Sequence, residues 1–393
     1  MHLPTAADGH HASPASAAPH VPPGLDRDSW RRAARRLLLK MISEFAYEEI
    51  VKPEPEPGPA AETHRAPGEG GVPVPAEHGH PDVPGRFRPY RLRVNDELTV
   101  RFRARRTAYG HWRIDPASLT PVGLDPFGFL AHAHDTVLGL TGDTTGHLIR
   151  ELTATLTADV GLAARGLTAA RLAELGYAEL EGHQPGHPWL VANKGRLGFS
   201  ASDATRWAPE ARQARSLPWI AVRTGLAAYR GVPALAEPHR LYGRELGEDT
   251  LRGFRQTLRS RGLPPEEYLF LPVHPWQWDE TVAPLFAASL AADDIVPLHT
   301  DGDLRLPQQS IRTFLNTSRP DRHTVKLPLS VLNTLVWRGL PTERTLAAPA
   351  VTAWMHALRD ADPFGDLRLG QIVAESHRQH SLRAVGQAGQ QRA

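Results

Sequence analysis

The 393-residue chain contains no cysteine. That absence excludes disulfides, thiolate catalysis and cysteine-ligated zinc, and it fits a reducing compartment. Lys and Arg number 45 against 43 Asp and Glu, so the chain lacks the basic excess typical of binding to nucleic acid or an anionic membrane. No window approaches about 18 apolar residues, and the N-terminus lacks the pattern of a signal peptide. We therefore expect a cytoplasmic protein with small-molecule partners.

Composition divides the chain into four segments, the second of which contains an insertion. Residues 1–25 mix Pro, Ala, His and Gly without apolar periodicity, which predicts a disordered tail. A largely helical domain is expected over 26–180, with a disordered insertion at 53–84, where Pro, Gly and Glu dominate. Short apolar runs separated by Pro and Gly predict a β-rich domain over 181–345. Residues 346–393 end in a polar tail.

Local patterns predict several elements within these domains. Apolar residues recur at helical spacing over 30–45, with Asp28 or Ser29 as the N-cap, and alternation about Asn95 predicts a β-hairpin. A helix is expected to open at Asp125. Strands are predicted at 217–222, 268–273 and 295–298, and a helical stretch that begins as a strand is predicted over 321–338.

Three segments carry the residues suited to chemistry. The first sets His187, Lys194 and Arg196 among glycines, as an anion-binding loop requires, although a basic surface turn has the same composition. In the second, an apolar strand leads into His274 and Gln277, where open sheets build sites; a packed corner is the alternative.

The third segment holds a row of cations and hydroxyls. Ser310, Arg312 and Thr313 are assigned to one strand, so that Ser310 and Arg312 project from the same face, and Lys326, Thr334 and Arg338 follow. Such groups converging on one pocket would suit a triphosphate and a polycarboxylate, because Arg binds oxyanions bidentately and Lys acts as a point charge.

These segments, in this order, resemble the IucA/IucC family of siderophore synthetases. The matching features are a Gly-His-Pro segment leading to Lys-x-Arg-x-Gly-Phe, a Leu-Pro-Val-His-Pro-Trp-Gln strand end, and Ser-x-Arg-Thr followed by Lys-Leu and Thr-x-x-x-Arg. They fall within residues 183–341, and weaker similarity extends back to residue 28.

The resemblance implies an ATP-dependent ligase that works with Mg²⁺. It would adenylate citrate or a citrate derivative and condense it with an amine or hydroxyl to an amide or ester. The implied cofactor-binding residues are His187, Lys194, Arg196, Ser310, Arg312, Thr313 and Lys326. Thr334 and Arg338 would bind substrate, and the implied catalytic residues are Arg312, Lys326 and Arg338.

The resemblance also implies an α+β fold with a helical thumb-like part, a β-rich fingers-like nucleotide-binding part and a palm. Family members are longer, so we expect most of the palm to be lacking and 346–393 to be its start. Exposed apolar faces, with poor solubility or a homodimer, would follow.

Leu190 and Val191 also stand where many members carry a second His-Pro.

Two alternatives stay open or are set aside. A short chain leaves open a remnant that binds ATP or citrate without turnover. No metal site is expected on the protein, because the pairs His78 and His80, and His132 and His134, have no companion carboxylate at ligand spacing.

Overall fold

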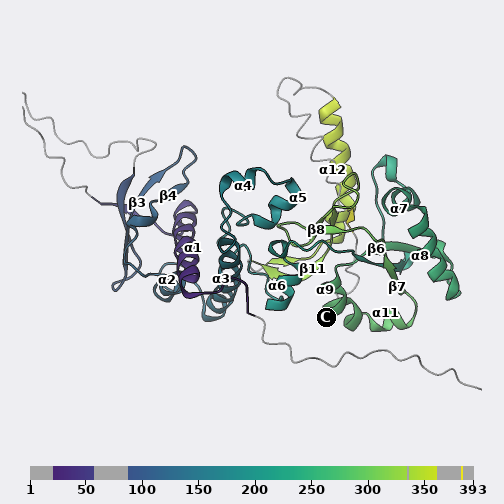
Figure 1. Ribbon diagram of the computed structural model, residues 1–393, viewed down its shortest axis with the longest axis horizontal. Helices are drawn as coiled ribbons and strands as arrows, with labels where there is room; N and C mark the ends of the chain where they lie inside the picture. The colour runs from purple at the N-terminus through teal and green to yellow at the C-terminus, as the bar shows by residue number, and fades with distance from the viewer. Residues whose placement is uncertain (1–20, 57–86, 334–335, 361–381, 384–393) are drawn as a thin grey trace, which may run out of the picture.

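The computed structural model describes residues 21–56, 87–333, 336–360 and 382–383 (Figure 1). Most of the predicted tail and insertion therefore lies outside the described residues, as does nearly all of the polar C-terminal segment. An N-terminal body occupies one end of the molecule in Figure 1, and a sheet covered by helices α7 and α8 occupies the other.

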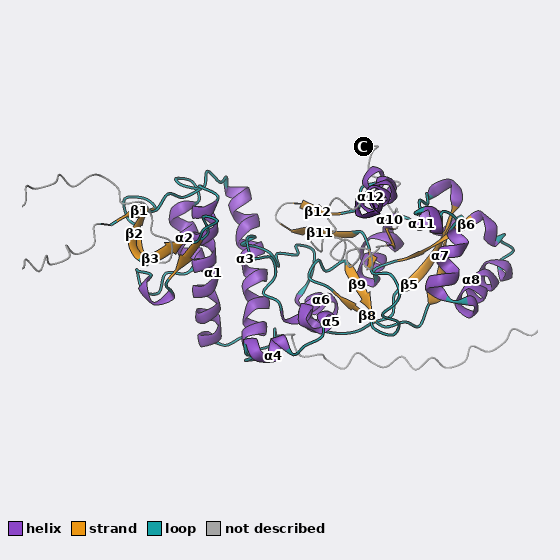
Figure 2. Ribbon diagram, turned by 90° about the horizontal axis from the view of Figure 1, so that it is seen from above, coloured by secondary structure: helices purple, strands orange, loops and turns teal. Residues whose placement is uncertain are grey.

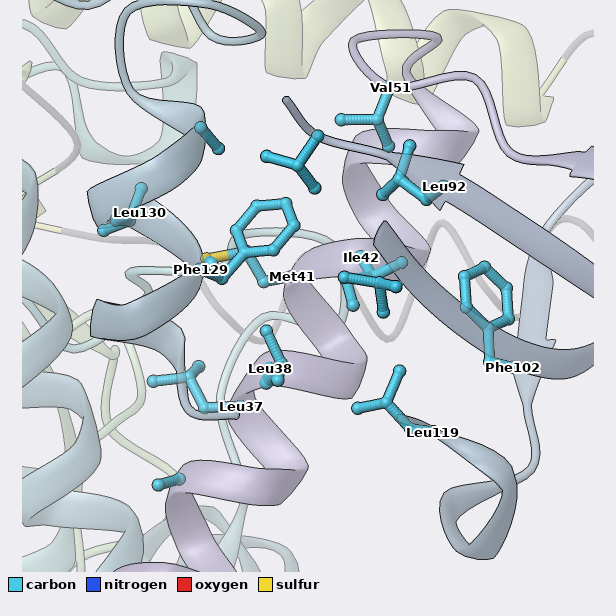
Figure 3. Close-up of a cluster of buried hydrophobic side chains, with 14 of the residues drawn as sticks. Leu37, Leu38, Met41, Ile42, Val51, Leu92, Phe102, Leu119, Phe129 and Leu130 are labelled. Atoms are coloured by element: carbon cyan, nitrogen blue, oxygen red, sulfur yellow. The ribbon is translucent and has the colours of Figure 1, made fainter. Parts of the chain in front are cut away.

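Helix α1 is the centre of the N-terminal body and spans Arg27–Tyr47. Its N-cap is Asp26, whose carboxylate accepts from the N–H groups of Asp28 and Ser29, so the predicted caps were wrong by two or three residues. Its apolar face fills the core in Figure 3, together with side chains from the neighbouring sheet and from α2. Burying this face, rather than helix propensity, stabilises the helix.

An antiparallel sheet packs against α1 in the order β1-β2-β3-β4. Its strands are β1 (Glu54–Pro55), β2 (Arg88–Arg93), β3 (Thr99–Arg106) and β4 (Trp112–Ile114). The hairpin predicted about Asn95 is confirmed, and its Oδ1 accepts from the N–H groups of Glu97 and Leu98. The predicted start of the insertion at residue 53 was wrong, because Glu54 and Pro55 form strand β1 and pair with β2.

Two further helices complete this body: α2 (Pro126–Ala133) and α3 (Gly142–Ala163). Asp125 caps α2, as predicted, by accepting from Gly128 N–H at 2.7 Å. Leu152, Leu156 and Val160 on α3 are fully buried in the same core as α1. The short helices α4 (Ala169–Ala173), α5 (Tyr177–Leu180) and α6 (Ala201–Trp207) lead into the second half.

The three predicted strands of the second half are confirmed and form one antiparallel sheet, β6-β5-β7. They are β5 (Pro218–Arg223), β6 (Tyr268–Pro272) and β7 (Ile295–Thr300). The amphipathic helices α7 (Pro238–Leu246) and α8 (Glu248–Ser260) bury their apolar faces on this sheet. The short helices α9 (Pro275–Gln277), α10 (Ala283–Leu285) and α11 (Ala287–Ala291) connect β6 to β7.

Between these two parts lie short strands. They are β8 (Arg305–Pro307), β9 (Thr313–Asn316), β10 (Val325–Lys326), β11 (Leu329–Asn333), β12 (Val336–Arg338) and β13 (Leu382–Arg383), before and after α12 (Thr342–Asp360). The predicted helical stretch at 321–338 was wrong beyond its strand-like start. Pro328 removes a helical donor, and the alternation of buried Leu329 and Val331 about Ser330 suits a strand.

The predicted mixed α+β class is confirmed, whereas its division into thumb, fingers and palm stays a prediction. Among the described residues, every helix is too short or too polar to serve as a membrane span.

Candidate functional site

The first motif segment joins the β11–β12 hairpin, which lies between α3 and the β6-β5-β7 sheet (Figure 2). Leu197 and Leu332 exchange two backbone hydrogen bonds of 2.7 and 3.0 Å. Asn333 then clamps the loop, because its Oδ1 accepts from Gly195 N–H at 3.0 Å and its Nδ2 donates to the Asn193 carbonyl at 3.2 Å. A Cβ at Gly195 would lie 2.7 Å from the Glu151 Cγ, so this close approach requires glycine.

The second motif segment reaches the same hairpin through Gln277. Its Nε2 donates to the Ser330 hydroxyl at 2.9 Å, and its Oε1 accepts from the Ser330 N–H at 2.7 Å. A side-chain amide that pairs with both groups of a strand residue fixes the register of that strand. Gln277 therefore acts in the described structure as a support for β11.

The third segment meets the hairpin through Arg312. Its guanidinium donates to the carbonyls of Arg338 and Gly339 at 2.5 and 2.7 Å, which ties the residues before β9 to the end of β12. Ser310 and Arg312 lie in a turn before β9, so their assignment to a strand was wrong. The reason is backbone shape, because Ile311 between them adopts φ +64° in the left-handed region.

Two other residues of the third segment face each other in the sheet. Thr313 on β9 and Lys326 on β10 are register partners, and the Thr313 hydroxyl contacts the Ser310 hydroxyl at 2.5 Å. Thr334 lies outside the described residues. The hairpin thus brings Arg312 and Arg338 together, with Lys326 on the neighbouring antiparallel pair.

Lys194 and Arg196 are buried in an ion network. The Lys194 ammonium contacts Asp159 on α3 at 2.5 Å, and Arg196 forms a bidentate pair with Glu210 at 2.7 and 3.0 Å. Burial raises the pKa of Glu210, but the charge and hydrogen bonds of Arg196, with help from Lys194, outweigh that effect and hold the pKa at about 2. Both basic side chains are committed to protein carboxylates in this arrangement.

His187 is exposed on the same loop, in contrast to Lys194 and Arg196. Its Nδ1 accepts from the Trp189 N–H at 3.2 Å, which leaves Nε2 as the ring nitrogen that can donate to a ligand. The His187 carbonyl accepts from Lys40 Nζ on α1 at 2.7 Å and from Asn193 Nδ2 at 3.0 Å. The loop is therefore attached to the N-terminal body.

His274 is completely buried and neutral. Burial lowers its pKa to about 3, and its Nδ1 accepts from the Trp276 N–H at 3.1 Å. The ring packs between Trp207 and Phe314. This environment is the packed corner that was the alternative interpretation of the second segment.

Sequence patterns missed the partners that hold these segments: Lys40, Asp159, Glu210 and Asn333. Each is a common polar residue in an ordinary amphipathic or loop context, and its partner lies between 14 and 150 residues away. The Gly195 position does carry a local signal, because glycine is the default residue where a backbone must approach another group closely.

Mg²⁺ finds no ready site among the described residues, since no three His, Asp or Glu side chains there could together hold a metal ion. Two carboxylates beside the first motif segment, Asp159 and Glu210, are instead paired with Lys194 and Arg196, and Glu181 accepts from the Gln309 N–H of the third segment.

The fold resembles that of a siderophore synthetase. The structure of aerobactin synthetase IucC from Klebsiella pneumoniae superposes with a TM-score of 0.66 at 28% identity, covering 86% of this chain and 55% of that chain. A model of the IucA / IucC family matches residues 176–382, more than half of the chain. The chain belongs to this family.

Relatives agree with this membership along nearly the whole chain. The rhizobactin siderophore biosynthesis protein RhbF of Rhizobium meliloti is 36% identical over 364 residues, which are 90% of this chain and 55% of that protein. ATP-bound aerobactin synthetase IucA from Klebsiella pneumoniae shares the fold at 18% identity and a TM-score of 0.54, over 86% of this chain and 55% of that one. The chain spans about half the length of the relatives it matches.

Proposed function

We propose that this chain is the nucleotide-binding part of an ATP-dependent ligase of siderophore biosynthesis. Its carboxylate substrate would be citrate or a citrate derivative, and its acceptor an amine or hydroxyl. The observation that carries the proposal is the convergence of three motif segments on one hairpin: Gly195 through Asn333, Gln277 through Ser330, and Arg312 through Arg338. Family membership and the ATP bound by a relative of the same fold support it.

The proposed reaction has two steps. A carboxylate oxygen attacks the α-phosphorus of ATP, the bond from that phosphorus to the bridging oxygen breaks, and pyrophosphate leaves. The amine or hydroxyl then attacks the acyl carbon, AMP leaves with the bonding pair, and the nucleophile releases a proton. The first step needs positive charge near the phosphate oxygens because a carboxylate anion must approach the triphosphate anion, and the second needs it to stabilise the departing AMP.

Lys326 and Arg338 are the cations that we assign to phosphate and carboxylate. Both are half-buried: Arg338 ends the hairpin, where its guanidinium donates to the Asn333 carbonyl at 3.1 Å, and Lys326 lies on β10. Arg312 has a supporting role in this proposal. By donating to the Arg338 and Gly339 carbonyls, it fixes the backbone that carries Arg338. His187, exposed and with Nδ1 occupied by the Trp189 N–H, is the donor that we assign to the nucleotide through Nε2.

Lys194 and Arg196 receive a different role from the one implied by the resemblance. Their charges are neutralised by Asp159 and Glu210, and displacing either carboxylate would leave a charge buried without a partner. We propose that they set the shape of the loop and leave the triphosphate to Lys326, Arg338 and His187.

Calorimetric titration of the chain with ATP, with and without Mg²⁺, tests nucleotide binding. Arg338→Ala should weaken ATP binding at least tenfold, the effect of about 1.4 kcal/mol from one charge-assisted contact. Arg171→Ala is the matched control, because Arg171 lies exposed on α4, where its guanidinium pairs with the exposed Glu174 at 2.6 Å. Absence of binding by the wild-type chain, or equal losses in both variants, would refute the proposal.

A second candidate is a unit that binds ATP or citrate without turnover. The observation favouring it is the coverage of its relatives, about 55% of the length of RhbF. Pyrophosphate release measured with ATP, Mg²⁺, citrate and a diamine separates the candidates. Release above the rate of an Arg338→Ala control supports the ligase, and ATP binding without release supports the binding unit.

A further inference from the structure

The loop that carries His187 is held from outside by one lysine of α1. Lys40 Nζ donates to the His187 carbonyl at 2.7 Å and to the Leu190 carbonyl at 2.8 Å. These contacts join residues 147 and 150 positions apart in the chain. A single ammonium can satisfy two carbonyls at once, because it offers three donors on a flexible stem.

An aromatic stack makes a second attachment of the same loop to the same body. The Trp189 ring stacks on His111 with centroids 5.2 Å apart and an interplanar angle of 11°. His111 in turn stacks on Tyr47 at 4.1 Å and 22°. Tyr47 ends α1 and His111 precedes β4, so the stack restrains the loop from two elements of the N-terminal body.

We propose that Lys40 is a positioning residue of the proposed nucleotide site, whose ammonium holds the His187–Leu190 turn and so fixes where His187 presents its Nε2–H. The role of the turn in binding a nucleotide rests on the proposed function. It assigns no contact between Lys40 and a ligand. The stack acts on the Trp189 side chain, whereas the lysine, together with Asn193 Nδ2, restrains the backbone of His187 itself.

The charges around Lys40 make the attachment dependent on pH. Burial lowers the pKa of Lys40 to about 8, with Asp159 on α3 and Glu44 on α1 opposing the shift and Lys194 adding to it. Above that pH the ammonium loses its proton, and its hydrogen bonds lose the charge that strengthens them. The turn is therefore held most firmly below pH 8.

Hydrogen exchange of amides in residues 185–193 tests the attachment without any ligand. Lys40→Met should raise their exchange rate several-fold at pH 7, and Lys40→Arg, which keeps the charge, should restore part of the protection. The ratio of the Lys40→Met rate to the wild-type rate should approach one by about pH 9.5, a change that a purely structural lysine would not produce. Arg36→Met, on the exposed face of α1, is the matched control and should change nothing.

Calorimetric titration with ATP then tests the consequence. Wild-type affinity should fall as the pH passes 8, whereas Lys40→Met should bind about tenfold more weakly at pH 7 without that fall. Unchanged exchange in Lys40→Met overturns the attachment, while a wild-type chain that binds no ATP overturns the proposed function instead. If Lys40→Met fails to fold, wild type is compared with Lys40→Arg instead. The proposal is then refuted if amide exchange of residues 185–193 in wild type does not become faster than in Lys40→Arg above pH 8.

Discussion

Removing the charge of Glu210 tests how the motif loop is held. Glu210→Gln keeps the size of the side chain but leaves the buried guanidinium of Arg196 without its counter-ion. A carboxyl pKa held at about 2 instead of the ordinary 4.5 corresponds to about 3 kcal/mol of stabilisation of the charged form. The cost of breaking a buried ion pair, about 3–5 kcal/mol, agrees with this magnitude.

The pH dependence of this loss has a definite sign. Because the folded-state pKa of Glu210 lies below the unfolded value, its stabilisation is fully present above pH 4.5 and is lost as the pH falls toward 2. Urea unfolding followed by circular dichroism at pH 7 should therefore show Glu210→Gln less stable by about 3 kcal/mol. At lower pH the difference between wild type and variant should shrink.

A double variant separates the charge from the packing. Arg196→Met with Glu210→Leu removes both charges at similar volume, so it should recover most of the stability that Glu210→Gln loses. A loss below about 1 kcal/mol in Glu210→Gln, the size expected for an exposed pair, would refute the reasoning. So would a loss that stays constant from pH 7 to pH 3.

Three further predictions concern the same framework. Gly195→Ala should destabilise the fold by about 1–3 kcal/mol in thermal melts, because the new Cβ would meet Glu151 and Asn333 within 2.9 Å, whereas Gly225→Ala, with open space around it, should not. Wild type should gain stability relative to Lys40→Met as the pH rises from about 8 to 10.5, since the unfolded lysine binds the proton more tightly; parallel curves would contradict this. His274 is neutral when folded, so wild type should lose roughly 2 kcal/mol relative to His274→Phe between pH 6.5 and 5, and equal acid dependence in urea melts would count against it.

Strands and helices with strong local patterns were predictable from the sequence. The runs that became β5 and β6 are apolar and buried along most of their length, β7 begins with the buried pair Ile295 and Val296, and Asp125 before Pro126 signals a helix start. The stretch at 321–338 failed because its apolar residues fit more than one period, and pairing across the hairpin decided the outcome.

The candidate site was predictable only as a set of segments. Motif resemblance picked out Arg312 and Lys194, but it could not tell that one donates to backbone carbonyls and the other to Asp159. Those partners depend on tertiary contacts between residues far apart in the chain. The left-handed Ile311, which places Ser310 and Arg312 in a turn, has no sequence signal because isoleucine disfavours that conformation.

The clamp that Asn333 places on the motif loop also dictates an order of assembly. The core of the N-terminal body draws its buried side chains from residues no later than Ala192, so it can close early during synthesis. Gly195 and Asn333 are 138 positions apart in the chain, so their contact carries a large cost in loop-closure entropy. That cost is offset only once the hairpin has formed. The loop therefore takes its final shape as a late event, after the ribosome has released β11 and its partner strand.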